Sequence, residues 1–400
     1  MSTHQKIDRD SGNAITNALS FFETPHTNVS ISNSSFIELL TLNPVNITPF
    51  HFKIHASTNY VDLAKCYVLT ELRIRKEDEH GRLTNLEAAD NNVSCCQLIG
   101  HTIWKNCRIS INGTQIFEGN SLMAYKRYYD DGDLGLNGVG FENRRLLFAP
   151  SADGTQKSAQ FMAKLDVDIC NQPRYLINQC EVDIELLPNE SNFLIVASGA
   201  NNHKYHLEIL ACKLYIKKIE LMDSLAFDIA KKLELKPARY PMRKTSLKSL
   251  FISENRTEFN ANLWMDQVPR RVVLGMVKNA DFVGSQKTHP FNFQHFNLRD
   301  ISITAGGVTF PAAPYSLDFP NGKYVRIYHD MQEAIAYAGL RNQEDNGPEM
   351  FDLIKNGTTS IRMTFNEPVP NGGIVLVAMG EIDSLLMLDR NRTISTDISV

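Results

Sequence analysis

The chain has 400 residues, a length typical of about two or three domains. Its 41 basic and 45 acidic residues give a net charge of −4, which argues against a protein that binds nucleic acid or membranes through overall positive charge. A content of 43% hydrophobic and 22% charged residues is that of a folded globular protein and excludes a disordered chain.

No targeting or membrane-spanning segment is visible. No run approaches the roughly 18 apolar residues that a membrane span needs. Residues 1–10 are polar and lack the apolar core of a secretory signal, so we expect no secretion through a signal peptide. The seven cysteines are odd in number and show no Cys-x-x-Cys spacing, which predicts reduced core thiols rather than disulfides or a zinc ribbon.

The N-terminal residues 1–30 are expected to form a flexible arm. Ala14, Ala18 and Phe22 fall at helical spacing, and Pro25 follows them, which predicts one short amphipathic helix. Two interpretations remain open: the helix docks on the protein's own core, or it reaches towards a neighbouring subunit or another partner.

After the arm, the hydrophobic period changes to that of strands with one buried face. Asn112-Gly113, set between apolar residues, predicts a tight hairpin. A helix is expected over 223–235 and another over 324–340, with strand patterns resuming between and after them. The sequence therefore predicts two strand-rich halves, 31–222 and 241–400, joined by a helical connector at 223–240. The expected strands include residues 50–56, 66–74, 182–186, 207–216, 250–252, 272–276, 301–303, 361–365 and 374–377.

No set of residues with catalytic or metal-binding spacing emerges. On a strand, His51 and His55 would lie about 13 Å apart, too far for one ion. His203 and His206 lack an obvious carboxylate partner nearby in sequence. The glycine-rich segment 132–140 lacks the Gly-Lys-Ser/Thr of a phosphate-binding loop, and no Gly-x-Ser-x-Gly occurs. We expect no catalytic residue, metal, cofactor or enzymatic activity.

The connector and the residues after it carry a basic run against a single glutamate, Glu234. It is interpreted as a solvated surface, or alternatively as a face towards packaged nucleic acid or a partner's acidic loop. The run consists of Lys231, Lys232, Lys236, Arg239, Arg243, Lys244 and Lys248.

Several blocks resemble the double jelly-roll major capsid proteins of Polinton/Maverick elements and adinto-like viruses. The similar blocks run in order from about residue 19 to 393 and are strongest between 238 and 328. They are residues 19–30 (LSFFETPHTNVS), 59–68 (NYVDLAKCYV), 109–114 (ISINGT), 238–243 (ARYPMR), 268–277 (VPRRVVLGMV), 279–285 (NADFVGS), 290–296 (PFNFQHF), 319–324 (FPNGKY) and 388–392 (LDRNR).

This resemblance implies an all-β chain of two tandem jelly-roll sandwiches, with a few short helices in the loops and the connector. The residues that carry it are expected to be structural rather than catalytic. They are Tyr60, Asp62, Leu63, Asn112, Gly113, Tyr240, Pro241, Pro269, Arg271, Gly275, Pro290, Phe291, Asn292, Phe293, Asn321, Gly322, Asp389 and Arg390.

The resemblance further implies a virion protein whose homotrimers form pseudo-hexameric blocks of an icosahedral shell around DNA. Neighbouring trimers and minor capsid or penton proteins would be its partners, while contact with an inner membrane or a receptor stays open. The long loops 77–94 and 118–160 are expected to carry much of the trimer contact, with Tyr125, Tyr128 and Tyr129 as candidate contacts.

Three alternatives remain. The first is a domesticated or host-encoded relative that forms no particle. The second is a jelly-roll glycan-binding module, for which the three tyrosines beside Asp130 and Asp131 are the candidate cluster. The third is a jelly-roll enzyme, which the missing ligand set disfavours.

Overall fold

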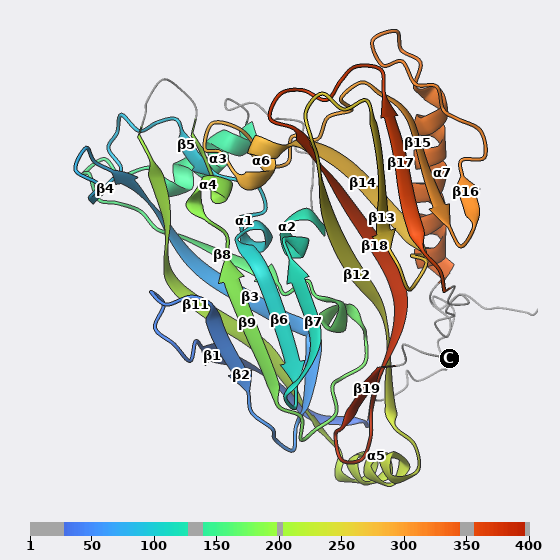
Figure 1. The fold of residues 1–400 in the computed structure, drawn as a ribbon. Helices are drawn as coiled ribbons and strands as arrows, with labels where there is room; N and C mark the ends of the chain where they lie inside the picture. Colours follow the sequence, from blue (N-terminus) through green and yellow to red (C-terminus); the bar gives the residue numbers. More distant parts are fainter. Residues whose placement is uncertain (1–27, 127–138, 198–202, 345–355, 397–400) are drawn as a thin grey trace, which may run out of the picture.

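The computed structural model describes residues 28–126, 139–197, 203–344 and 356–396. Within these ranges the chain forms two β-sandwiches that stand side by side, with strands running roughly along a common direction (Figure 1). The expected helix within the N-terminal arm, Tyr128, Tyr129 and most of the glycine-rich segment lie outside the described residues.

The first sandwich contains two sheets of antiparallel strands. One sheet has the order β1-β11-β3-β4 with β8 also paired to β3, and the other has the order β2-β9-β6-β7. A small β5-β10 ladder lies apart from them. The strands are β1 (Ile31–Leu40), β2 (Phe50–Ile54), β3 (Tyr60–Glu77), β4 (Leu83–Asn85), β5 (Val93–Cys95), β6 (Trp104–Ile111), β7 (Thr114–Asn120), β8 (Ala159–Lys164), β9 (Val182–Pro188), β10 (Ile195–Ala197) and β11 (Tyr205–Leu221).

The second sandwich repeats this arrangement. Its sheets have the orders β12-β18-β14, with β19 beside β18, and β13-β17-β15-β16. The strands are β12 (Ala238–Ile252), β13 (Glu258–Trp264), β14 (Arg271–Lys278), β15 (Leu298–Ala305), β16 (Val308–Phe310), β17 (Thr359–Phe365), β18 (Ile374–Leu388) and β19 (Ile394–Thr396).

The strand pairing is nested, as a jelly roll requires. In the first half the outermost strands pair as β1–β11, the next as β2–β9, then β3–β8 and finally β6–β7. In the second half β12 pairs with β18, β13 with β17 and β15 with β16. The expected double jelly roll is confirmed, because each half folds as one long hairpin that is wound into two facing sheets.

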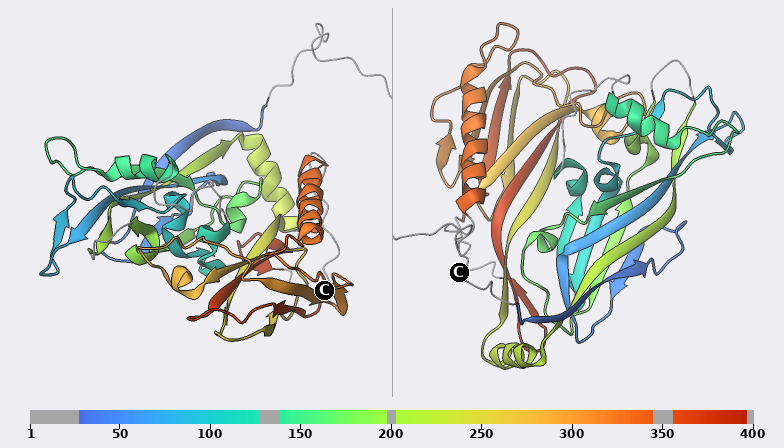
Figure 2. Two further views of the ribbon diagram at one scale, coloured as in Figure 1. Left: turned by 90° about the horizontal axis from the view of Figure 1, so that it is seen from above. Right: turned by 180° about the vertical axis from the view of Figure 1, so that it is seen from behind.

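Short helices lie in the connections, and two of them were expected. The connector helix α5 (Asp223–Leu235) lies across one end of the molecule, and α7 (Val325–Glu344) stands along the second half (Figures 1 and 2). Within the described residues, no helix is long and apolar enough to cross a membrane. The others are α1 (Ile99–Thr102), α2 (Leu122–Lys126), α3 (Val139–Phe148), α4 (Ser191–Leu194), α6 (Asn279–Val283) and the 3₁₀ turn Asp168–Asn171.

The strand that opens the second half starts earlier than the sequence suggested. The expected strand covered residues 250–252, whereas β12 runs from Ala238 and includes Pro241. Proline has no amide hydrogen to donate, so strands that contain it lie at sheet edges. Within the described residues β12 has β18 on one side only, so Pro241 is accommodated opposite Leu385.

The hairpin predicted at Asn112-Gly113 joins β6 to β7. Both residues adopt the left-handed backbone conformation, with φ of 48° and 78°. Asparagine and glycine tolerate this conformation better than other residues, which makes the pair favourable in a two-residue turn.

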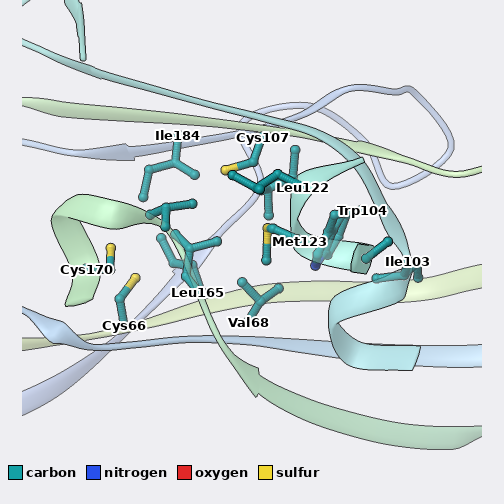
Figure 3. Packing of buried hydrophobic residues seen from close by; sticks show 14 of the residues in the cluster. Cys66, Val68, Ile103, Trp104, Cys107, Leu122, Met123, Leu165, Cys170 and Ile184 are labelled. Carbon is teal, nitrogen blue, oxygen red and sulfur yellow. The ribbon is translucent and has the colours of Figure 1, made fainter. Parts of the chain in front are cut away.

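The core of the first half is closely packed around sulfur and aromatic side chains (Figure 3). Trp104 meets the Phe50 ring edge-on, with centroids 6.1 Å apart. The seven cysteines are buried and free, as expected of core thiols; they are Cys66, Cys95, Cys96, Cys107, Cys170, Cys180 and Cys212. Burial raises the pKa of Cys95 to about 12, so its thiol stays protonated and unreactive at neutral pH.

The second half has a core of its own, in which Trp264 lies directly over Gly380. A β-carbon added to Gly380 would lie 2.6 Å from Cζ2 of Trp264. We therefore expect Gly380→Ala to lower the free energy of unfolding by about 1–3 kcal/mol through overpacking.

Urea denaturation of Gly380→Ala, Trp264→Leu and the double variant tests this packing. The two changes should be strongly coupled, because the smaller Leu side chain makes room for the methyl group. Strictly additive losses of stability would contradict the packing described for Gly380.

Candidate functional site

The two halves contact each other at several levels of their junction. The buried cluster of the first half extends into the second through residues of β12, β14 and β18 and the segment before β15; they are Tyr240, Val277, Phe291, Val375, Val377, Leu386 and Leu388. At mid-height, the amide of Thr245 donates to Oδ2 of Asp168 at 2.9 Å, and both residues are buried. The two sandwiches are therefore packed into one body.

An aromatic cluster closes the upper part of the junction. The Tyr125 ring, on α2 of the first half, lies 5.8 Å from the Phe282 ring and 5.3 Å from the Phe291 ring of the second half. Phe293 and Phe193 also meet it, at 6.1 and 6.4 Å. Aromatic pairs at such distances contribute roughly 0.5–1.5 kcal/mol each beyond the burial of their area.

This placement corrects the expected role of Tyr125. The tyrosine was a candidate contact between copies and a candidate glycan-binding residue, but it is only 7% exposed and its ring is enclosed by the chain itself. Its side chain is therefore unavailable to a second copy or to a glycan. Its neighbour in the cluster, Phe293, lies over Gly275, where a β-carbon would come within 2.7 Å of the ring.

Hydrogen bonds fix the lower part of the junction. The buried Tyr240 hydroxyl accepts the amide of Ile177 at 3.0 Å and donates to the carbonyl of Tyr175 at 3.2 Å. The Arg392 guanidinium donates to the carbonyl oxygen and to Oδ1 of Asn178, both at 2.8 Å. Burial raises the pKa of Tyr240, so its hydroxyl keeps the proton that it donates.

The hairpin turn of the first half takes part in the same contact. Nδ2 of Asn112 donates to the carbonyl of Arg392 at 2.9 Å, and its Oδ1 accepts the amide of Glu181 at 2.8 Å. Arg392 itself is presented by a turn in which Oδ1 of Asp389 accepts the amides of Asn391 and Thr393. A local turn motif in each half thus contributes to holding the halves together.

Most of the other residues that carry the capsid resemblance lie in the core, in strand pairs or in turns. Leu63 is a core residue, and Oδ1 of Asp62 accepts the amide of Ala64. Arg271 pairs with Glu381 on the neighbouring strand, and Gly322 adopts positive φ in a turn. Tyr60 and Pro269 are buried, and Pro290 and Asn292 flank the buried Phe291. The Asn321 side chain donates a hydrogen bond to Asp318. Arg390 is exposed.

The described residues contain no group of three or more His, Cys, Asp or Glu side chains that could hold a metal ion. The residues around His206 in the sequence do not reveal its partner. Its Nε2 lies 2.9 Å from Oε2 of Glu77 on the adjacent strand β3. This contact spans 129 positions of the chain and is a cross-strand pair between β11 and β3.

One exposed apolar surface lies on β1 and the loop that follows it. Along its ten residues β1 pairs only with β11 among the described residues, so one backbone edge is open. Phe36 is 57% and Leu40 is 64% exposed, and Glu38 is the one charged residue of the strand. An open strand edge beside exposed apolar side chains is a place where another chain can pair. We call Phe36, Leu40, Leu42 and Ile47 the β1 surface.

Another exposed apolar surface lies on α7, in the other half of the molecule. Among the residues of α7 whose burial is described, 325–334, only Ile327 and Asp330 are partly buried. The helix is held by the hydrogen bond from the Tyr315 hydroxyl to Asp330, 2.9 Å long, and by Arg326, which donates to two loop carbonyls. We call its exposed stripe, Tyr324, Val325, Tyr328 and Met331, the α7 surface.

Comparisons with known proteins agree with this architecture. No family model matches the sequence. An uncharacterized Caenorhabditis elegans protein, F54H12.2, is 27% identical over 413 residues, covering 91% of this chain and 97% of the relative.

Solved structures of viral capsid proteins share the fold over nearly the whole chain. A chain of the Sputnik virophage structure matches with a TM-score of 0.66 at 11% identity, covering 100% of this chain and 95% of that one. The mavirus major capsid protein matches at 0.55 and 11%, covering 98% and 97%. VP54 of PBCV-1 matches at 0.54 and 11%, covering 95% and 100%. At these identities the likeness shows a common fold, the double jelly roll.

Replacing Tyr240 by Phe tests the hydrogen bonds of the junction. The variant leaves the Ile177 amide buried without an acceptor, which should lower the free energy of unfolding by about 1–3 kcal/mol in urea denaturation. Tyr125→Phe is the matched control, because that buried hydroxyl has no hydrogen-bond partner among the residues that the structure describes, and its removal should cost little. Equal losses for the two variants would show that the junction does not depend on the Tyr240 hydroxyl.

Proposed function

We propose that this chain is a major capsid protein whose copies assemble into homotrimers that tile an icosahedral shell around a DNA genome. The observation that carries the proposal is the pair of similar sandwiches packed into one body, with apolar surfaces left open on both halves. Likeness to capsid proteins over nearly the whole chain supports it.

The difference between these surfaces supports a ring of copies, and the resemblance to capsid proteins sets the proposed number of copies at three. An isologous dimer needs one self-complementary patch, whereas two different patches favour a head-to-tail contact that closes into a ring. The β1 surface belongs to the first half and the α7 surface to the second, so each copy offers both partners of such a contact (Figure 2). Three copies place six similar lobes about one axis, which suits hexagonal tiling.

The shell-forming role has further consequences. Contacts between trimers would be smaller and more polar than contacts within them, so that misplaced blocks can dissociate. Minor capsid and penton proteins would fill the positions that six-lobed blocks cannot, and the finished protein would reside in the virion. On the sequence blocks described above, we place the chain with the capsid proteins of Polinton/Maverick elements and adinto-like viruses.

A second candidate is a capsid-derived protein that serves its host without forming particles. A C. elegans protein that aligns along nearly the whole chain favours this alternative, since a related protein is encoded by an animal. The two candidates share the fold and differ in assembly, so the mass of the purified protein separates them.

Charged substitutions in the β1 surface test the assembly proposal. Leu40→Asp would bury an unpaired carboxylate between copies, which should weaken association by at least about tenfold, or ~1.4 kcal/mol. Light scattering after gel filtration should then give the variant the molar mass of one chain. The unaltered protein should have the molar mass of three chains.

Val283→Asp is the control for this substitution. Val283 is also well exposed, but it lies on α6, away from both surfaces. This variant should remain trimeric, and both variants should keep the thermal melting temperature of the unaltered protein. A Leu40→Asp protein that still elutes as a trimer would exclude β1 from the contact, and an unaltered protein of one chain mass would overturn the proposal.

A further inference from the structure

The connector helix α5 presents an unusual outer face. Its inner side packs against the protein through Leu225, Ile229 and Leu233. On the opposite side, Phe227, Lys231 and Leu235 follow one another at four-residue spacing and point outward. Phe227 is 68% and Leu235 85% exposed. A helix of a protein that only contacts water would carry polar residues on this side.

This helix forms part of one end of the molecule. It lies across the ends of the strands, below β12 and β19, rather than along a side wall (Figure 1). The exposed Met222 precedes it directly and adds a third apolar side chain. We call Met222, Phe227 and Leu235 the basal apolar residues. The β1 and α7 surfaces lie on flanks, so the basal residues are a separate surface.

Basic side chains surround the basal apolar residues. Lys231, Lys232, Lys236 and Arg239 are exposed on α5 and just after it. Arg390 is exposed at the same end, because Leu388 pairs with Ala238 in the β12–β18 ladder. The exposed acids of the same region are Glu220, Asp223, Asp228 and Glu234, so the five basic groups exceed the acids by one; within residues 231–239, four basic groups face Glu234 alone.

We propose that this end of the molecule docks on the surface of an anionic lipid bilayer. Exposed Phe and Leu side chains can enter the boundary between headgroups and acyl chains while lysines remain among the headgroups. An anionic membrane attracts basic groups within a Debye length of about 8 Å. A helix that lies across the end of the molecule brings all of these side chains to a flat surface together.

A lipid surface fits this face better than nucleic acid does. Phosphate groups of DNA are recognised by basic and polar side chains, and Leu235 and Met222 offer them nothing. Three apolar side chains give weak binding for one chain. An array of copies facing one membrane multiplies this attraction without any new contact.

Vesicle co-sedimentation of the full chain tests this docking. Vesicles of equal parts phosphatidylserine and phosphatidylcholine should bind the protein, and vesicles of phosphatidylcholine alone should bind it less. Phe227→Ser combined with Leu235→Ser should lower the bound fraction about tenfold through the loss of apolar contact. Lys231→Glu combined with Lys232→Glu should abolish the preference for phosphatidylserine.

Val283→Ser combined with Leu146→Ser is the matched control. These residues are also exposed but lie on α6 and α3, near the opposite end of the molecule, so binding should be unchanged (Figure 1). Circular dichroism and gel filtration establish that each variant folds and keeps its oligomeric state.

Two results would overturn the docking proposal. In the first, the unaltered protein binds neither kind of vesicle. In the second, binding to vesicles is unaffected by the Phe227 and Leu235 changes while duplex DNA competes for the same lysines, which would make the surface a polyanion site. Gel filtration of the same samples reports whether the chain assembles, so failure to bind vesicles is distinguishable from failure of the shell-forming role.

Discussion

The buried contact between the two jelly rolls is the constraint on which the rest of the structure depends. Without it, two sandwiches joined by α5 could turn against each other, and the surfaces they present to other copies would have no fixed relation. The aromatic cluster around Tyr125, the Asp168–Thr245 hydrogen bond and the bonds of Tyr240 and Arg392 act at different heights of the junction. Rotation about any single contact is therefore prevented by the others.

The same architecture combines well-packed cores with a surface on which several apolar side chains stay exposed. Nested pairing places the long strands of each half in two sheets around a packed core. The surfaces left open include the edge of β1, one side of α7 and the outer face of α5. These apolar surfaces expose side chains that a solitary soluble protein would replace by polar ones. They are the natural places for copies of the chain and a further partner to bind.

Local signals in the sequence were sufficient for much of the fold. Alternating apolar residues indicated most of the long strands, Asn112-Gly113 indicated its hairpin, and proline positions indicated the end of α5. The apolar period alone placed the first strand of the second half at residues 250–252, and only the resemblance to capsid proteins indicated a strand entry at 238–243; the finished sheet shows that β12 is an edge that accommodates Pro241. Local patterns report what one segment prefers, whereas an edge is a property of the whole sheet.

The site was predicted less well, because its residues come together from distant parts of the chain. Tyr125 was expected on the surface, since nothing near it in sequence reveals that Phe282 and Phe291 enclose its ring. Arg392 and Asn178 are 214 positions apart in the sequence, and no pattern in either segment predicts their hydrogen bond. Tyr240 and Asp389 were singled out only by the resemblance to capsid proteins, and their partners became apparent with the fold.

Electron microscopy of the purified full-length protein tests the central claim most directly. The account predicts threefold particles with six lobes, in which the α7 surface of one copy faces the β1 surface of the next. Particles with two lobes and the mass of one chain, or lobes at variable angles to each other, would contradict it.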